Sequence, residues 1–238
     1  MLHKFDVPAL TRGNMLAKPY GDWTTKDRVN VVLSNPPFGG TEEDGTESNF
    51  PAKFRTKETA DLFLALIVKI LRTNGRAGVV LPDGSLFGEG VKTRIKEELM
   101  EKCNLHTIVR LPNGVFSPYT SIKTNLLFFD KGTATKEIWY YELPYPDGIK
   151  NFNKTRPINI NDFDVLKTWW NDRVENEYAW KVSAEEIKAK NYNLDSKNPY
   201  EAAENFIAPE KLLAQYQAIE NNIKTIQNNI VKTLSEVL

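Results

Sequence analysis

One short turn in this 238-residue sequence combines residue types that could do chemistry. Asn35, Pro36, Pro37 and Phe38 directly follow an apolar run at 29–34. The side-chain carbonyl of Asn35 and the backbone carbonyl of Pro36 could accept hydrogen bonds from one amine, while the fixed φ of the prolines holds the turn rigid. Two such acceptors favour a tetrahedral nitrogen, which makes the delocalised lone pair of an exocyclic ring amine available for methylation. Phe38 would then stack on the extruded base.

The same four residues also suit a purely structural role. Two prolines after a strand often end that strand, and a neighbouring aromatic side chain often packs on the core. The two interpretations differ in one observable property, because a turn that binds a base must be exposed and must open onto a cavity. A turn sealed inside the protein would exclude the methylation hypothesis.

The predicted elements would place this turn where ligands commonly bind. Short apolar runs predict five or six strands, and the five that can be placed lie at 29–34, 77–82, 105–112, 124–130 and 137–143. Helical spacing of apolar residues predicts one crossover helix within 58–75, with Gly75 as its C-terminal cap, and a second over 91–104. This alternation predicts an α/β fold with a partial, doubly wound, Rossmann-like and largely parallel sheet. Ligand sites in such sheets lie at the carboxyl ends of strands.

The sequence pattern changes twice beyond the last predicted strand. We expect a partial sheet domain at 1–143 and an appended region at 144–206, which is rich in proline, asparagine and aromatic residues. Residues 207–238 predict a long helix, because four- and three-residue steps separate the apolar side chains Leu212, Tyr216, Ile219, Ile223, Ile226 and Ile230. This heptad stripe predicts that 210–238 pairs with a helix of a partner, associates with a second copy, or docks on its own domain.

Composition and charge exclude several classes of protein. Lys+Arg and Asp+Glu both number 31, so no overall basic field attracts nucleic acid, and any DNA contact must be local or shared with another subunit. Cys103 is the single cysteine and lies on the apolar face of the helix predicted at 91–104, so we expect a buried thiol, no intrachain disulfide and no metal site. No segment approaches the roughly 18 uncharged apolar residues of a membrane span, and no signal peptide is visible. We therefore expect a soluble, cytoplasmic protein.

The sequence resembles the modification subunits of type I restriction–modification systems, which are adenine-N6 DNA methyltransferases. The resemblance rests on the N-P-P-F turn after a strand and on GRAGVVLPDGSLFGEG at 75–90, IVRLPNGVFSPYTSIKTNLLFFDKG at 108–132 and WKVSAEEIKAKNYNLDSKNPY at 180–200. It implies a class I methyltransferase fold that transfers a methyl group from S-adenosylmethionine to N6 of adenine in DNA. It also implies two protein partners, a specificity subunit and a restriction subunit.

The resemblance assigns roles to individual residues. The turn at 35–38 would bind the target amine and stack the base. Asn14 would meet the adenine ring of S-adenosylmethionine, where the family often has an aspartate, and a simple turn after Gly13 is an equally good interpretation. Phe116 and Tyr119 would lie in a loop near the target base, although a plain turn leading into the next strand is the simpler interpretation.

The resemblance also predicts what the chain lacks. The family begins its sheet with a strand that ends in a glycine-bearing cofactor loop and a second strand that ends in an acidic, ribose-binding residue. No G-x-G-x-x-G segment occurs here, so we expect a C-terminal portion that binds S-adenosylmethionine weakly or not at all and is inactive alone. A protein glutamine methyltransferase with the same type of turn and a non-catalytic assembly module are the alternative functions.

Overall fold

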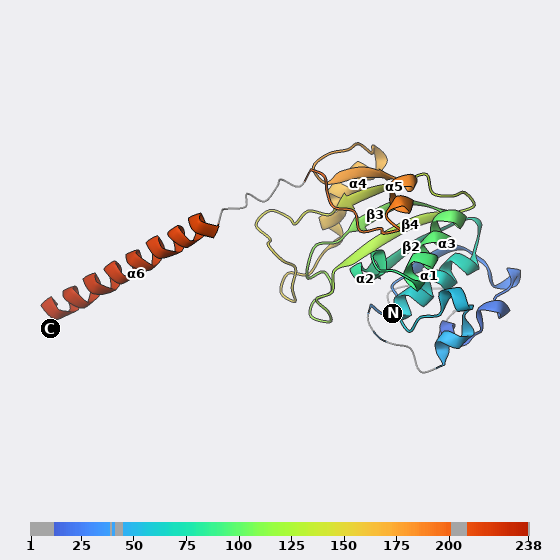
Figure 1. Cartoon of the computed structure of the whole chain (residues 1–238), viewed down its shortest axis with the longest axis horizontal. Coiled ribbons are helices and arrows are strands. Elements are labelled where there is room, and N and C mark those ends of the chain that lie inside the picture. The colour runs from blue at the N-terminus through green and yellow to red at the C-terminus, as the bar shows by residue number, and fades with distance from the viewer. Residues whose placement is uncertain (1–11, 39, 41–44, 201–208, 238) are drawn as a thin grey trace. The chain divides into compact units, whose positions relative to one another are not determined.

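The computed structural model describes residues 12–38, 40, 45–200 and 209–237 (Figure 1). The chain divides into two compact units, Met1–Tyr200 and Glu201–Leu238, and each is described by itself. The first unit contains the sheet and the turn at 35–38, and the second contains one long helix. The domain boundaries that we expect after residues 143 and 206 stay a prediction.

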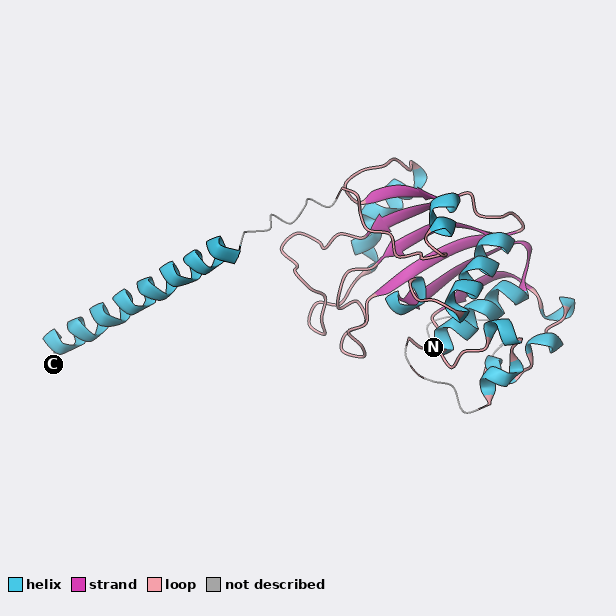
Figure 2. Cartoon of the chain, in the orientation of Figure 1, coloured by secondary structure: helices cyan, strands magenta, loops and turns pink. Residues whose placement is uncertain are grey.

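The first unit is built on a six-stranded mixed sheet (Figure 2). Its order is β1-β2-β4-β3-β5-β6, and the strands are β1 (Val29–Ser34), β2 (Leu71–Pro82), β3 (Cys103–Arg110), β4 (Thr124–Lys131), β5 (Glu137–Glu142) and β6 (Ala179–Ser183). β1 is parallel to β2 and β3 is parallel to β5, whereas β4 is antiparallel to β2 and β3, and β6 is antiparallel to β5. β4 reverses direction because residues 111–123 join it to β3 without a crossover helix.

Two crossover helices cover one face of this sheet, as the apolar spacing predicts. α1 (Thr59–Ile70) links β1 to β2, and α3 (Val91–Lys102) lies between β2 and β3. Leu62 and Leu66 of α1 and Ile95 and Leu99 of α3 belong to one buried core with the sheet. The short helix α2 (Asp83–Leu86) precedes α3 at the carboxyl end of β2.

Segments that follow β5 cover part of the opposite face and extend the sheet. α4 (Asp164–Asn171) packs Leu166 and Trp169 against Val109 and Tyr141. β6 then adds an outer strand that the sequence analysis missed, and α5 (Ala184–Ala189) follows it. Short 3₁₀ helices occupy Met15–Ala17, Tyr20–Asp22, Thr25–Asp27, Thr46–Asn49, Ala52–Phe54 and Ile160–Phe163.

The predicted role of Gly75 as a helix cap is wrong. The backbone becomes extended at Leu71, directly after α1, and Gly75 lies inside β2. A Cβ atom at position 75 would lie 2.8 Å from the carbonyl oxygens of both Arg72 and Asn30. The register between β1 and β2 shifts at this point, so the glycine is required by close approach of two backbones and not by a helix end.

Cys103 is buried as expected, but in a strand. α3 ends at Lys102, and Cys103 is the first residue of β3. Burial raises the pKa of its thiol to about 12, so the thiol stays protonated and unreactive at neutral pH. Within the described ranges, no three His, Cys, Asp or Glu side chains lie close enough together to hold a metal ion.

The second unit is the helix α6 (Pro209–Val237). Its apolar stripe keeps the predicted spacing and comprises Tyr216, Ile219, Ile223, Ile226 and Ile230. Leu212 also lies in α6, but its side chain falls outside the described residues. Because a single helix has no core of its own, such a stripe gains stability only by packing against another element. Of the helices described, none combines the length and the apolar character needed to cross a membrane.

Candidate functional site

The turn at 35–38 follows the carboxyl end of β1 and is partly open to solvent. Asn35 and Pro37 are exposed, Pro36 is buried, and Phe38 is half-buried. The buried proline anchors the turn on the fold, while the exposed amide of Asn35 can meet a ligand. The sealed turn that would exclude the methylation hypothesis is therefore not found.

A cavity of about 650 Å³ opens beside this turn. Its walls are formed by Asn35, Pro36, Pro37, Phe38, Phe116, Tyr119, Thr120 and Ile122. Small-molecule pockets usually measure roughly 300–1,000 Å³ and combine apolar walls with a few polar groups. The fold thus brings together the two segments that the sequence analysis singled out separately, the turn at 35–38 and the loop before β4.

Two aromatic rings form one wall of the cavity. The ring centroids of Phe38 and Phe116 lie 4.7 Å apart with an interplanar angle of 72°, an edge-to-face contact that fixes both rings. Tyr119 is 92% exposed and lies at the rim. The loop is also a turn, because the Tyr119 N–H donates to the Phe116 carbonyl over 2.9 Å. The loop is thus a turn that leads into β4 and also lines the cavity, and its contact with a target base stays a prediction.

The loop that carries Phe116 is attached to a segment that follows β5. Gly114 has φ +80°, and a Cβ atom there would lie 1.9 Å from the backbone oxygen of Phe152. The Phe152 N–H donates to the Asn113 carbonyl over 3.3 Å, and the Asn113 N–H donates to the Tyr145 hydroxyl over 2.8 Å. Only glycine fits this approach, so Gly114 helps to fix the position of Phe116, a role that the sequence analysis missed.

A polar pair connects the ends of two neighbouring strands near the turn. Asn125, at the start of β4, is fully buried, and its side-chain amide donates to the Asp83 carboxylate over 2.6 Å. The Asp83 N–H donates to the Lys123 carbonyl over 3.0 Å. The Leu111 N–H also donates to the Thr124 carbonyl over 3.1 Å. Together these hydrogen bonds hold both ends of the loop at 111–123. The sequence analysis did not single out either residue of this pair.

A buried lysine holds the segment that follows β2. Lys96 of α3 is 1% exposed, and its ammonium group donates to the carbonyl oxygens of Leu86 over 2.8 Å and Gly88 over 3.2 Å. Burial lowers the pKa of Lys96 to about 8, although the negative charge of Asp61 acts to raise it. Asp61 of α1 is itself buried, which raises its pKa although the Lys92 ammonium lies 3.5 Å away. This cluster ties α1 and α3 to the carboxyl edge of the sheet.

The lowered pKa of Lys96 predicts a pH dependence of stability. In the unfolded chain this lysine has its ordinary pKa of 10.5. Between pH 8 and pH 10 the unfolded state therefore binds more protons than the folded state, so rising pH favours folding. We expect wild type to gain on the order of 2 kcal/mol of unfolding free energy over this range relative to Lys96→Met. Urea unfolding followed by far-UV circular dichroism at both pH values measures this difference. Exposed Lys188→Met is the matched control, and an equal pH dependence in all three proteins would contradict the prediction.

Asn14 has a structural role in the described chain. Its side-chain oxygen accepts the Leu16 N–H over 2.9 Å at the start of the first 3₁₀ helix, where Leu16 is fully buried. Asn49 donates to the carbonyl oxygens of Leu16 over 3.0 Å and Ala17 over 3.2 Å, which fixes the same segment. These bonds agree with the simple turn, and contact of Asn14 with a cofactor stays a prediction.

The fold of this chain is similar to that of solved structures from type I restriction systems. One from Vibrio vulnificus YJ016 has a TM-score of 0.75 and 49% sequence identity, and the match covers 79% of this chain and 42% of that chain. A structure described for complex assembly and conformational transition of a type I restriction–modification system has a TM-score of 0.77 and 37% identity. That match covers 97% of this chain and 50% of the other.

Sequence comparison leads to the same group of proteins. The methylase subunit of the type I restriction enzyme EcoEI from Escherichia coli is 54% identical over 246 residues, which is 100% of this chain and 50% of that subunit. The chain spans half the length, or less, of the curated relatives that it matches. The family model for N-6 DNA methylases matches residues 1–206. The chain therefore belongs to the N-6 DNA methylase family.

Proposed function

We propose that this chain is the base-binding part of an adenine-N6 DNA methyltransferase of a type I restriction–modification system. The observation that carries the proposal is the exposed Asn35 amide at the end of β1, beside a cavity with the Phe38–Phe116 wall. The carboxyl end of a strand in a doubly wound sheet is the usual place for a ligand. An aromatic wall next to a hydrogen-bond acceptor suits a flat base with an exocyclic amine.

The proposed chemistry uses acceptor groups of the turn. The Asn35 side-chain carbonyl and the Pro36 backbone carbonyl would each accept a hydrogen bond from one N–H group of the adenine N6 amine. These two hydrogen bonds would pull both N–H groups toward the turn and make the nitrogen more tetrahedral. Its lone pair would then be localised on the nitrogen and could attack a methyl carbon. Because Pro36 is buried and both prolines have fixed φ, little reorganisation is needed when the base enters. S-adenosylmethionine would supply the methyl group: its S–CH3 bond would break as the N–CH3 bond forms, S-adenosylhomocysteine would leave, and the nitrogen would lose one proton to solvent.

The described residues suit the amine side of the reaction but not a complete cofactor site. Asn14, which the resemblance assigns to the cofactor, already accepts the Leu16 N–H. The sequence has no G-x-G-x-x-G segment that could form a glycine-bearing cofactor loop. We therefore propose that the chain alone binds S-adenosylmethionine weakly and is inactive, and that activity requires the part of the relatives that it does not match.

We also propose that the chain works with a specificity subunit, a restriction subunit and DNA. The net charge of zero gives no general attraction for DNA, so another subunit would provide most of the DNA contact. The apolar stripe of α6, from Tyr216 to Ile230, has the four–three spacing that pairs with a second helix, which suits docking to a helical partner.

A chimeric enzyme tests the proposed function without requiring two fragments to assemble. The matched half of the EcoEI methylase subunit is replaced by this chain, and the chimera is expressed with the EcoEI specificity subunit. We expect N6-methyladenine in DNA that carries the EcoEI recognition sequence, measured by mass spectrometry of digested DNA. The chain alone is the negative control. Methylation of a protein glutamine without methylation of DNA would favour the alternative enzyme, and a folded chimera without any methylation would favour an assembly module.

A further inference from the structure

An exposed aromatic side chain lies at the rim of the cavity beside the turn at 35–38. Among the large apolar side chains that the structure describes, Tyr119 is the most exposed, at 92%, and it lines this cavity. An isolated exposed ring needs no explanation on most of a protein surface. Here it lies next to the place that we assign to a base taken out of DNA, so its position relative to that base matters.

The backbone holds Tyr119 in a fixed place. The N–H groups of Tyr119 and Thr120 both donate to the Phe116 carbonyl, over 2.9 Å and 3.2 Å. The Ser117 N–H donates to the Gly114 carbonyl over 3.0 Å, so the segment before the ring is fixed as well. A ring that is already positioned loses little conformational freedom when it packs against a ligand. Tyr119 is therefore presented to solvent by a preorganised turn and not by a loose loop.

The two rings at the ends of this turn have different surroundings. The hydrogen bond from Tyr119 to Phe116 joins residues three positions apart, which places their Cα atoms within about 7 Å of each other. Phe116 is half-buried and packs edge to face on Phe38. Tyr119 makes no ring contact with any other described residue. One ring thus belongs to the cavity wall, and the other is available to a group that lies just outside the cavity.

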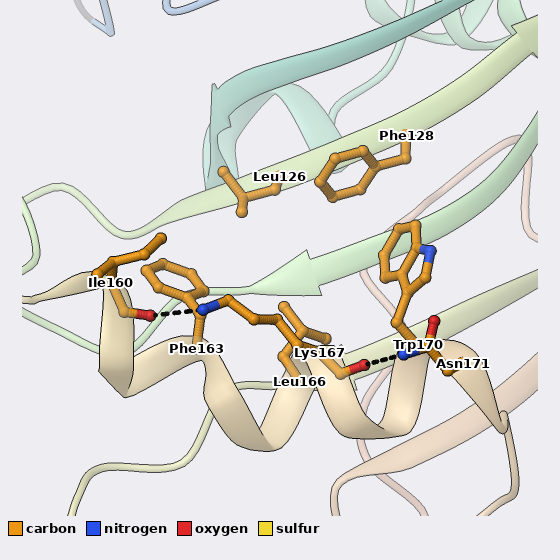
Figure 3. Close-up of a pocket in the computed structure, with 8 residues that line it drawn as sticks. All are labelled: Leu126, Phe128, Ile160, Phe163, Leu166, Lys167, Trp170 and Asn171. Atoms are coloured by element: carbon orange, nitrogen blue, oxygen red, sulfur yellow. Dashed lines mark hydrogen bonds between the residues drawn. The ribbon is translucent and has the colours of Figure 1, made fainter.

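A second cavity shows that exposure at a rim does not by itself supply such a ring (Figure 3). It measures about 510 Å³ and lies between β4 and α4. Its exposed apolar residue is the aliphatic Ile160, at 70%. Its aromatic side chains are less exposed, and those of Phe128 and Trp170 pack edge to face, 4.9 Å apart. An exposed aromatic ring is therefore found beside the turn at 35–38 but not at this cavity.

Extrusion of a base creates a need that such a ring can meet. The base pairs on either side lose a stacking neighbour, and the base on the opposite strand loses its pairing partner. Apolar side chains inserted between base steps can fill spaces of this kind, and an aromatic ring stacks on any base because every base has a π-face. A phenol ring is flat like a base, and its hydroxyl group can both donate and accept a hydrogen bond. Tyrosine therefore suits both the stacking and the pairing edge of the remaining base.

We propose that Tyr119 enters the double helix when the target adenine leaves it. The ring stacks between the neighbouring base pairs, and its hydroxyl group bonds the thymine that is left unpaired on the opposite strand. Phe38 and Phe116 hold the extruded base at one end of the turn, and Tyr119 fills the vacated space at the other end. This inference rests on the proposed function and adds to it a contact with the DNA strand that is not methylated in that step.

A DNA substrate that needs no such filling tests the inference. The chimeric enzyme is given either fully paired DNA or DNA with an abasic site opposite the target adenine, which lowers the cost of extrusion. Single-turnover methylation is measured for wild type, Tyr119→Ala, Tyr119→Phe and Tyr200→Ala. Tyr200→Ala is the matched control, because Tyr200 is 49% exposed and lines neither cavity. Each variant is compared with wild type on the same DNA, so any effect of the abasic site on recognition cancels.

We expect Tyr119→Ala to lower the rate about tenfold or more on paired DNA, but less than about threefold on DNA with the abasic site. Tyr119→Phe keeps the ring and should lose less than Tyr119→Ala, and Tyr200→Ala should match wild type. Circular dichroism of each isolated chain checks the fold, which we expect to be normal because both tyrosines are exposed.

Two results would overturn the inference alone. Equal losses for Tyr119→Ala on both DNAs would mean that the ring acts on the extruded base or on the loop and not in the vacated space. A rate for Tyr119→Ala within about threefold of wild type on paired DNA would mean that the ring is not needed for extrusion. A wild-type chimera that methylates neither DNA would overturn the proposed function itself, and this inference with it.

Discussion

The change Asn35→Ala in the chimeric enzyme should reduce the rate of adenine methylation about 100-fold or more, because it removes one of two acceptors that act on the amine. Fold stability should change by no more than about 0.5 kcal/mol, since exposed side chains without structural contacts rarely contribute more. Single-turnover incorporation of a labelled methyl group measures the rate, and urea unfolding of the isolated chain measures the stability. The expected result is therefore a large loss of rate in a protein that is folded normally.

Two further variants separate the role of the Asn35 oxygen from a general effect of mutation. Asn35→Asp keeps an acceptor oxygen in the same place, so it should lose less activity than Asn35→Ala. Asn161→Ala removes the same side chain from an exposed position in another part of the first unit and should leave the rate unchanged. If Asn35→Ala methylates DNA within threefold of wild type, the amide is not an acceptor for the amine and the proposed chemistry fails.

Much of the sheet could be predicted because several of its strands are short, mostly apolar runs. The runs at 29–34 and 124–130 became β1 and β4 with almost unchanged bounds. β6 could not be predicted in the same way, since Ala179–Ser183 is short and carries an exposed lysine in its middle. Its strand character depends on pairing with β5, where Trp180 stacks on Tyr140 with ring centroids 5.4 Å apart. That contact joins residues 40 positions apart, and local pattern does not encode it.

The candidate site shows the same division between local and distant information. The turn at 35–38 could be singled out because its residue types, rigidity and position after a strand are all local properties. Its contact with Phe116 joins distant parts of the chain and follows from the topology alone. The pair formed by Asp83 and Asn125 was missed for this reason too, since each residue looks like an ordinary turn or strand residue by itself. The exposure of Val31 and Leu33 could not be predicted either, because the apolar run at 29–34 suggests burial on both faces.

The change Gly114→Ala should lower the free energy of unfolding of the first unit by about 3 kcal/mol or more. The left-handed backbone conformation accounts for about 1–2 kcal/mol of this loss, and forcing a methyl group into a filled space accounts for a further 1–3 kcal/mol or so. The atom in the way is the Phe152 backbone oxygen, which cannot rotate aside as a flexible side chain would. The loop must therefore shift as a whole, and Phe116 must move with it.

Gly148→Ala is a matched control that isolates the steric part of this effect. Gly148 has φ +76°, close to the +80° of Gly114, but a Cβ atom there would meet nothing within 4 Å. It should lose only the conformational contribution, about 1–2 kcal/mol. Urea unfolding of both variants gives the difference, and equal losses would mean that the Phe152 segment does not hold the loop. The edge-to-face contact between Phe38 and Phe116 depends on where that loop is anchored. We therefore expect Gly114→Ala, but not Gly148→Ala, to change the near-ultraviolet circular dichroism of the phenylalanine rings.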